Sequence, residues 1–154
     1  MSDDIKKQMW EAMASHPNVM VSLKHQDDPA IPMRAQLDKD ADSEFWFYTS
    51  KGNRLEDGGQ AEVQFVSNGH DLFASIRGTL KKETREEIID KYWNKSVSAW
   101  YDEGRDDPNL LMLRFSLSDA EIWEADPGVK GVYKLLTGKT IDPDEMGKHD
   151  KVSL

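Results

Sequence analysis

Residues 44–54 read EFWFYTSKGNR and hold the most informative pattern in the chain. Aromatic residues crowd its first half, and aromatic side chains favour the pleated, half-buried surface of a β-strand. Its second half contains a glycine and two cations, Lys51 and Arg54, which is typical of a loop. We therefore predict a strand over 44–50 that runs directly into a basic loop, or one short helix, over 50–60.

On both sides of this stretch, apolar and polar residues alternate with a period of two, as they do in half-buried strands. The dipeptide Asn68-Gly69 is typical of a tight hairpin. Several short strands separated by turns favour an antiparallel barrel or sandwich over βαβ units. The predicted strands cover residues 19–23, 31–37, 44–50, 61–66, 72–80, 109–117 and 119–123.

Apolar residues also recur at helical spacing in a few places. An amphipathic helix is predicted near the N-terminus, because Ile5, Met9 and Met13 are four residues apart, and it should stop at His16-Pro17. Thr84 and Glu87 form a capping box that predicts a second helix from there, which 96–101 would continue or follow as a third helix. We expect one further helix over 128–136 and an extended tail over 137–154, which is loosely held unless a partner subunit pins it.

Composition excludes several classes of protein. The 154 residues fit a single domain spanning 1–154. Acidic residues outnumber basic ones 29 to 20, which argues against DNA or RNA as a partner. There is no cysteine, no signal-peptide pattern and no apolar run long enough to cross a membrane. We therefore expect a cytoplasmic protein with no membrane partner.

The sequence offers no catalytic constellation of its own. The four histidines are scattered, without the spacing of metal ligands, so we predict no metal site. No serine lies in a nucleophile-elbow sequence, and the acidic pairs fall in turns and helix starts, where they serve capping and solvation. We assign no catalytic residue; if the protein is an enzyme, a cofactor should supply the reactive group.

A small group of cations stands out in this acidic chain. Arg34 lies in the second predicted strand, and Lys51 and Arg54 follow the third. A phosphate monoester carries between one and two negative charges near neutral pH, and it is best held by arginine forks together with hydroxyl and backbone donors. Thr49, Ser50 and Gly52 are placed to supply those donors.

The stretch FWFYTSKGNR resembles the FMN-phosphate loop of pyridoxamine 5′-phosphate oxidase-like flavoproteins, where an aromatic-Thr pair ends a strand and Arg follows a Gly. The resemblance continues through IPMRAQLD, SIRGTL and AEIWEAD, and so spans most of the chain. Residues 88–115 are similar to the general stress protein 26 branch, which shows a Trp-aromatic pair before Gly-x-Asp-Asp-Pro. Trp100-Tyr101 and residues 104–108 match that pattern.

This resemblance implies an antiparallel Greek-key split β-barrel with two to four flanking helices. It also implies a homodimer that binds FMN in a groove at the subunit interface. Arg34 and Arg54, joined by Lys51, would contact the phosphate. Trp123 would contact the flavin from one subunit or the other, and Trp100 is a further candidate. The implied cofactor-binding residues are Arg34, Ala35, Gln36, Phe47, Tyr48, Thr49, Ser50, Lys51, Arg54 and Trp123.

Two departures from the oxidase pattern argue against vitamin B6 oxidation. Leu55 replaces the second basic residue of the loop, and PGVKGVYKL has no Arg-x-His element to grip a pyridoxal phosphate. We therefore expect an FMN-dependent oxidoreductase linked to the general stress response, acting on a small electron donor or acceptor. The alternatives are a non-catalytic flavin-binding or flavin-sequestering protein, and a related barrel that binds a deazaflavin or haem.

Overall fold

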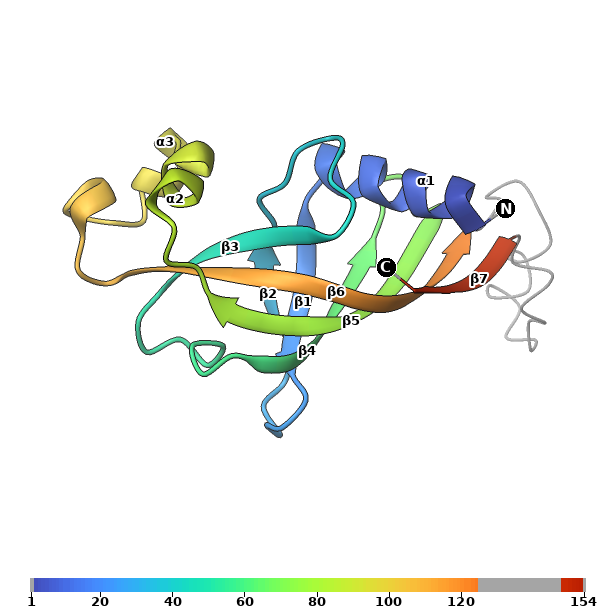
Figure 1. Cartoon of the computed structure of the whole chain (residues 1–154), viewed down its shortest axis with the longest axis horizontal. Coiled ribbons are helices and arrows are strands. Elements are labelled where there is room, and N and C mark those ends of the chain that lie inside the picture. Colours follow the sequence, from blue (N-terminus) through green and yellow to red (C-terminus); the bar gives the residue numbers. More distant parts are fainter. Residues whose placement is uncertain (1, 125–147, 154) are drawn as a thin grey trace.

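The computed structural model describes residues 2–124 and 148–153, with the side chains of residues 4–124. These residues form one seven-stranded antiparallel sheet, three α-helices and one 3₁₀ turn over Gly104–Asp106 (Figure 1). The helices are α1 (Ser2–Ser15), α2 (Glu86–Tyr92) and α3 (Lys95–Ser98). The strands are β1 (Asn18–Leu23), β2 (Ile31–Arg34), β3 (Glu44–Ser50), β4 (Gly59–Val66), β5 (Leu72–Lys82), β6 (Leu110–Glu124) and β7 (Lys148–Ser153).

The sheet curls into a nearly closed barrel because its two end strands return to each other. The strand order is β2-β1-β4-β5-β6-β3, and every neighbouring pair is antiparallel. A single isolated bridge then joins Gln36, just after β2, to Trp46 in β3. The prediction of a mainly β, antiparallel split barrel is confirmed.

Strand β6 is the longest element and runs the length of the barrel (Figure 1). One edge pairs with β5, while the other pairs first with β3 and then with β7. Our prediction of two strands over 109–117 and 119–123 is therefore wrong. The partner of Gly78 is Leu117 and that of Arg77 is Asp119, so a β-bulge at Ser118 lets a single strand continue.

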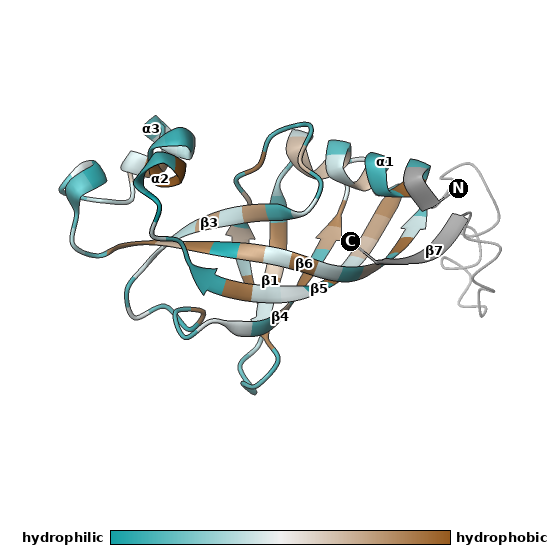
Figure 2. Ribbon diagram, viewed as in Figure 1, coloured by the Kyte–Doolittle hydropathy of each residue, from teal (hydrophilic) through white to brown (hydrophobic). Residues whose placement is uncertain are grey.

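The core fills the barrel interior and extends under α1. The Phe45 ring stacks on Phe115 at 5.0 Å between centroids, and Trp10 of α1 meets Phe45 edge-on at 6.1 Å. Hydrophobic residues colour the strands brown in Figure 2, whereas much of α1 is teal. The predicted amphipathic helix is confirmed: it ends at Ser15 and buries Ile5, Met9, Trp10 and Met13.

The second helical region differs from its prediction at the start. Helix α2 begins at Glu86 with Arg85 as its N-cap residue, so the capping box of Thr84 and Glu87 does not form. The carboxylate of Glu83 accepts the Arg85 backbone N–H and so takes over part of that role. Of the two options for 96–101, the structure shows a separate third helix, α3, which ends at Ser98.

The C-terminal predictions are only partly covered by the described residues. The helix predicted over 128–136, and residues 137–147 of the predicted tail, lie outside them. Residues Lys148–Ser153 instead form β7, which pairs with β6 through Asp119–Glu124. The last residues of the predicted extended tail are thus a strand of the sheet, which backbone pairing to β6 holds in place.

Candidate functional site

A groove of about 860 Å³ opens where β2 and β3 separate. One wall comes from the end of β2 and the residues after it, the floor from the end of β3, and the far wall from the segment that contains α3. This volume lies within the range of small-molecule and cofactor sites. The groove is lined by Ala14, Pro17, Pro32, Met33, Arg34, Ala35, Gln36, Leu37, Tyr48, Thr49, Ser50, Asn94, Lys95, Ser96, Val97, Trp100 and Tyr101.

The groove exists because β2 and β3 pair at one point only. Gln36 and Trp46 exchange both backbone hydrogen bonds, at 2.7 and 3.0 Å. The strand predicted over 31–37 ends early, at Arg34. Ala35 still donates its N–H to the carbonyl of Pro17, which lies opposite it just before β1, at 2.7 Å, but proline has no N–H to return the second bond of the pair. Beyond Trp46, β3 keeps β6 as its ladder partner but has none on the β2 side among the described strands.

This split leaves a strand edge facing the groove. Backbone N–H and C=O groups of successive residues in an antiparallel strand point to opposite neighbours. Since those of Trp46 point toward Gln36, both groups of Tyr48 and the N–H of Ser50 point to the same, open side, while the Ser50 carbonyl accepts the Asn53 N–H at 3.1 Å. The floor of the groove therefore presents alternating backbone donors and acceptors to whatever binds there.

The far wall is fastened to β3 by two tyrosines. The Tyr101 hydroxyl donates to the Thr49 carbonyl at 2.5 Å, and the Tyr48 hydroxyl donates to the carbonyl of Ile89. Burial raises the pKa of Tyr101 to about 12 and raises that of Tyr48 as well, so both phenols remain protonated donors. They hold the wall in place and do not serve as bases at neutral pH.

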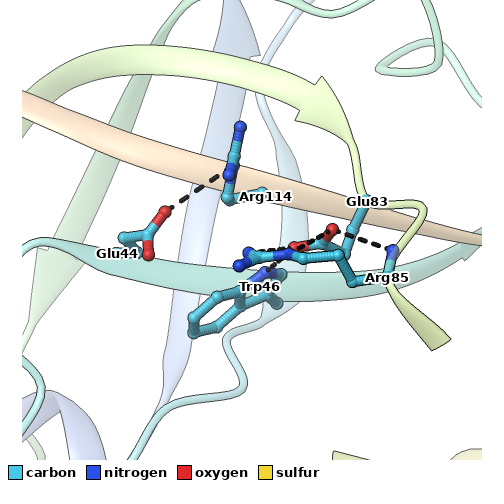
Figure 3. Close-up of polar contacts among 5 residues, drawn as sticks. All are labelled: Glu44, Trp46, Glu83, Arg85 and Arg114. Atoms are coloured by element: carbon cyan, nitrogen blue, oxygen red, sulfur yellow. Dashed lines mark hydrogen bonds and ion pairs between the residues drawn. The ribbon is translucent and has the colours of Figure 1, made fainter. Parts of the chain in front are cut away.

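A buried polar cluster supports the start of the same wall (Figure 3). The Glu83 side chain is only 4% exposed and accepts the Trp46 indole N–H at 2.9 Å. Arg85 donates to it from Nη2 at 2.7 Å and from Nε at 3.1 Å. The Trp46 ring also stacks on Tyr92 at 5.3 Å between centroids, which ties the last residue of α2 to β3.

The groove differs in charge from the rest of the protein. Among the described residues, the charged ones that line it are Arg34 and Lys95, and none is an aspartate or glutamate, although the chain contains 29 acidic residues. Hydroxyl and amide groups from Thr49, Ser50 and Ser96 lie among these cations. A groove of this composition is suited to an anionic ligand.

The structure brings together six of the ten predicted site residues: Arg34, Ala35, Gln36, Tyr48, Thr49 and Ser50. The other four are not among its lining residues. The Phe47 side chain is completely buried in the barrel core, and Lys51 is exposed. Arg54 donates to the Pro29 carbonyl at 2.8 Å, and Trp123 lies opposite Phe73, in the half of β6 that pairs with β7. The expected convergence of Arg34, Lys51 and Arg54 is not seen in this groove, which only Arg34 of the three lines.

The loop after β3 is closed by its own hydrogen bonds. The Gly52 N–H donates to Oε2 of Glu56 at 2.6 Å, and the Leu55 N–H donates to Oδ1 of Asn53 at 2.8 Å. Gly52 has a φ of +90°, a conformation that favours glycine. Leu55, which replaces a basic residue of the oxidase pattern, is completely buried and anchors the loop in the core.

The family comparison agrees with this architecture. The model of the family described as pyridoxamine 5′-phosphate oxidase like matches residues 4–142. The chain belongs to this family. Among its relatives is general stress protein 26 of Bacillus subtilis, 33% identical over 55 residues. That match spans 36% of this chain and 39% of the relative's length.

Solved structures of general stress proteins resemble the chain over more of its length. The general stress FMN/FAD binding protein of Xanthomonas citri is 40% identical, with a TM-score of 0.74 over 79% of this chain and 89% of its own. A protein of Jannaschia sp. CCS1 assigned as general stress protein 26 is 29% identical, with a TM-score of 0.79 over 99% of both chains. The predicted membership of the pyridoxamine 5′-phosphate oxidase-like family, in its general stress protein 26 branch, is confirmed.

Sequence reasoning missed most of the far wall of this family's groove. Asn94, Lys95, Ser96 and Val97 received no role, because nothing local shows that this segment folds over β3. Asn94 caps α3 by accepting the Val97 N–H at 3.0 Å, and Asn is a common N-cap residue, so the helix start was detectable. The position of this segment beside Thr49 was not detectable, because it depends on the long-range hydrogen bond from Tyr101 to Thr49.

Over residues 2–124 and 148–153, no helix is long and apolar enough to cross a membrane. Within the same ranges, no group of three or more metal-ligating side chains is arranged to hold a metal ion.

Proposed function

We propose that the groove between β2 and β3 binds a flavin, and specifically FMN. The observation that carries this proposal is the charge of the lining: its described residues include Arg34 and Lys95 and no carboxylate, in a chain of net charge −9. A phosphorylated ligand fits such a groove. The FMN/FAD binding relative from Xanthomonas citri supports a flavin as that ligand.

The residues present fit the two ends of an FMN molecule. The guanidinium of Arg34 and the hydroxyls of Thr49 and Ser50 suit the phosphate and the ribityl chain. The open edge of β3 at Tyr48 suits the pyrimidine part of the ring system, whose rim alternates hydrogen-bond donors and acceptors. Arg54 would join the phosphate only after leaving the Pro29 carbonyl.

Replacing Arg34 by alanine is expected to weaken FMN binding about tenfold to hundredfold, because a charge-assisted contact to the phosphate is lost. Titration followed by flavin fluorescence measures the dissociation constant. Arg54→Ala should have a smaller effect, since Arg54 is already bonded to Pro29. Lys24→Ala, at an exposed site just after β1, is the control. Unchanged affinity in Arg34→Ala would remove Arg34 from the site.

We further propose that the protein is a flavin-dependent oxidoreductase of the general stress response. Bound flavin supplies the electron or hydride transfer, so the chain need only position the ring and control access to it. Anaerobic mixing with NADH or NADPH should then bleach the flavin absorbance near 450 nm. Persistent absorbance with both donors supports the second candidate, a flavin-sequestering protein, which the missing Arg-x-His element favours.

The site is also proposed to lie between two copies of the chain. Trp123, which the family resemblance places at the flavin, is not among the residues that line the groove. A homodimer would let the partner cover the groove and would give Trp123 a role at the partner's flavin. Flavin retention should then fall on dilution below the dimer dissociation constant. A monomer that keeps its flavin would contradict the shared site.

A further inference from the structure

The far wall of the groove contributes a lysine, Lys95, whose charge is available to a ligand. Lys95 is the first residue of α3, its side chain is exposed, and it lines the groove. Among the residues that the structure describes, none forms a hydrogen bond or ion pair with this side chain. By contrast, Arg105, which follows the same wall in the chain, donates to the carboxylates of Glu86 and Asp90. The charge of Lys95 is therefore not compensated within the described part of the chain.

The start of the far wall stands beside Tyr48. The Tyr48 ring meets Trp93 edge-on at 5.8 Å between centroids, and its hydroxyl donates to the Ile89 carbonyl. Lys95 follows Trp93 by two residues, and the burial of Val97 fixes the single turn of α3 against the protein. Lys95 is therefore held beside the open backbone edge of Tyr48, the edge that suits the pyrimidine part of a flavin.

We propose that Lys95 stabilises the negative charge that a bound flavin acquires on reduction, and thereby raises the reduction potential of the flavin. This inference rests on the proposed flavin binding. When a hydride from a nicotinamide donor adds at N5, the ring gains two electrons and one proton, and the donor is oxidised. The ring then carries one negative charge, shared by N1 and the C2 carbonyl of its pyrimidine part. A cation beside that part attracts the reduced ring but not the neutral oxidised ring.

The variant Lys95→Gln tests this role with little change to the fold, because the side chain is exposed and the Asn94 cap of α3 is kept. We expect the affinity for reduced relative to oxidised FMN to fall about tenfold, which lowers the potential of a two-electron couple by about 30 mV. Lys95→Arg keeps the charge and should keep the potential of the parent protein. Anaerobic reductive titration against a reference dye measures the potential.

Riboflavin, which has no phosphate, separates an effect on the ring from an effect on the phosphate. If Lys95 acts on the ring, Lys95→Gln should lower the potential of bound riboflavin as much as that of bound FMN. The affinities for oxidised FMN and oxidised riboflavin should keep the ratio that they have in the parent protein. If that ratio falls in the variant while the riboflavin potential stays unchanged, Lys95 holds the phosphate and the inference is overturned.

Lys24→Gln removes the same charge at an exposed site just after β1, which does not line the groove, and should change neither the potential nor the ratio. A flavin potential in Lys95→Gln equal to that of the parent would overturn the role of Lys95 while leaving flavin binding intact. If the parent protein binds neither FMN nor riboflavin, the proposed function fails and this inference fails with it.

Discussion

Gly78→Ala is expected to destabilise the protein by about 3 kcal/mol or more, because the strand crossing at this position has no space for a methyl group. An added Cβ would lie 2.3 Å from the Ser116 carbonyl oxygen and 2.8 Å from Cζ of Phe115. The first of these atoms belongs to the backbone of β6, which cannot rotate away as a flexible side chain can. The Phe115 ring is fixed by its stacking on Phe45.

Gly69→Ala is a matched control for this substitution. An added Cβ there would meet only the Asp71 side chain, at 3.5 Å, an ordinary van der Waals distance. Both variants restrict the unfolded chain equally, so the difference between them reports the native structure. Urea unfolding gives both free energies. A Gly78→Ala protein as stable as Gly69→Ala would mean that β5 and β6 are not as closely apposed as the bulge at Ser118 places them.

The bulge also explains one limit of sequence-based prediction. Alternation located β1, β2, β4 and β5, because one face of each is more buried than the other. Strand β3 was located by its aromatic residues instead, since Phe45, Trp46 and Phe47 are all buried. In β6 the alternation was visible on both sides of Ser118. It failed at Ser118, where an extra residue reverses the alternation, and a reversal resembles a break between two strands. The resulting strand is nevertheless continuous, because β5 pairs on both sides of the bulge.

Only the part of the groove that β2 and β3 form could be predicted from the sequence. Arg34 and Tyr48 could be placed together because an aromatic strand and an arginine-bearing strand form a pattern typical of the family. Lys95 could not, because its position depends on long-range contacts such as that between Tyr101 and Thr49. In the loop beyond Ser50 the cations Lys51 and Arg54 were visible in the sequence. The hydrogen bond from the Gly52 N–H to the Glu56 carboxylate was not.

Glu83→Leu is expected to destabilise the protein by about 3 kcal/mol at pH 7, because it leaves the buried Trp46 indole N–H without an acceptor and removes the partner of Arg85. Glu83→Gln should cost less, since its carbonyl can still accept one hydrogen bond. Trp46→Phe removes the indole donor, and a double-mutant cycle with Glu83→Gln measures the coupling between the two side chains. Additive losses would mean that the contact in Figure 3 contributes nothing to stability.

The same carboxylate should give the protein a distinctive response to acid. Hydrogen bonds from Arg85 lower the pKa of Glu83 from 4.5 to about 2, against the opposing effect of burial. A carboxyl whose pKa is lower in the folded state stabilises the fold fully above its unfolded value, and that contribution is lost as the pH falls from about 4.5 toward 2. The stability gap between the parent and Glu83→Gln should therefore shrink across this window, which urea unfolding at stepwise lower pH measures.

Because Trp46 and Tyr92 connect this carboxylate to the far wall, flavin retention should decline over the same window in the parent protein. A gap that stays constant from pH 7 to pH 2 would show that Glu83 stabilises the wall by its shape and not by its charge.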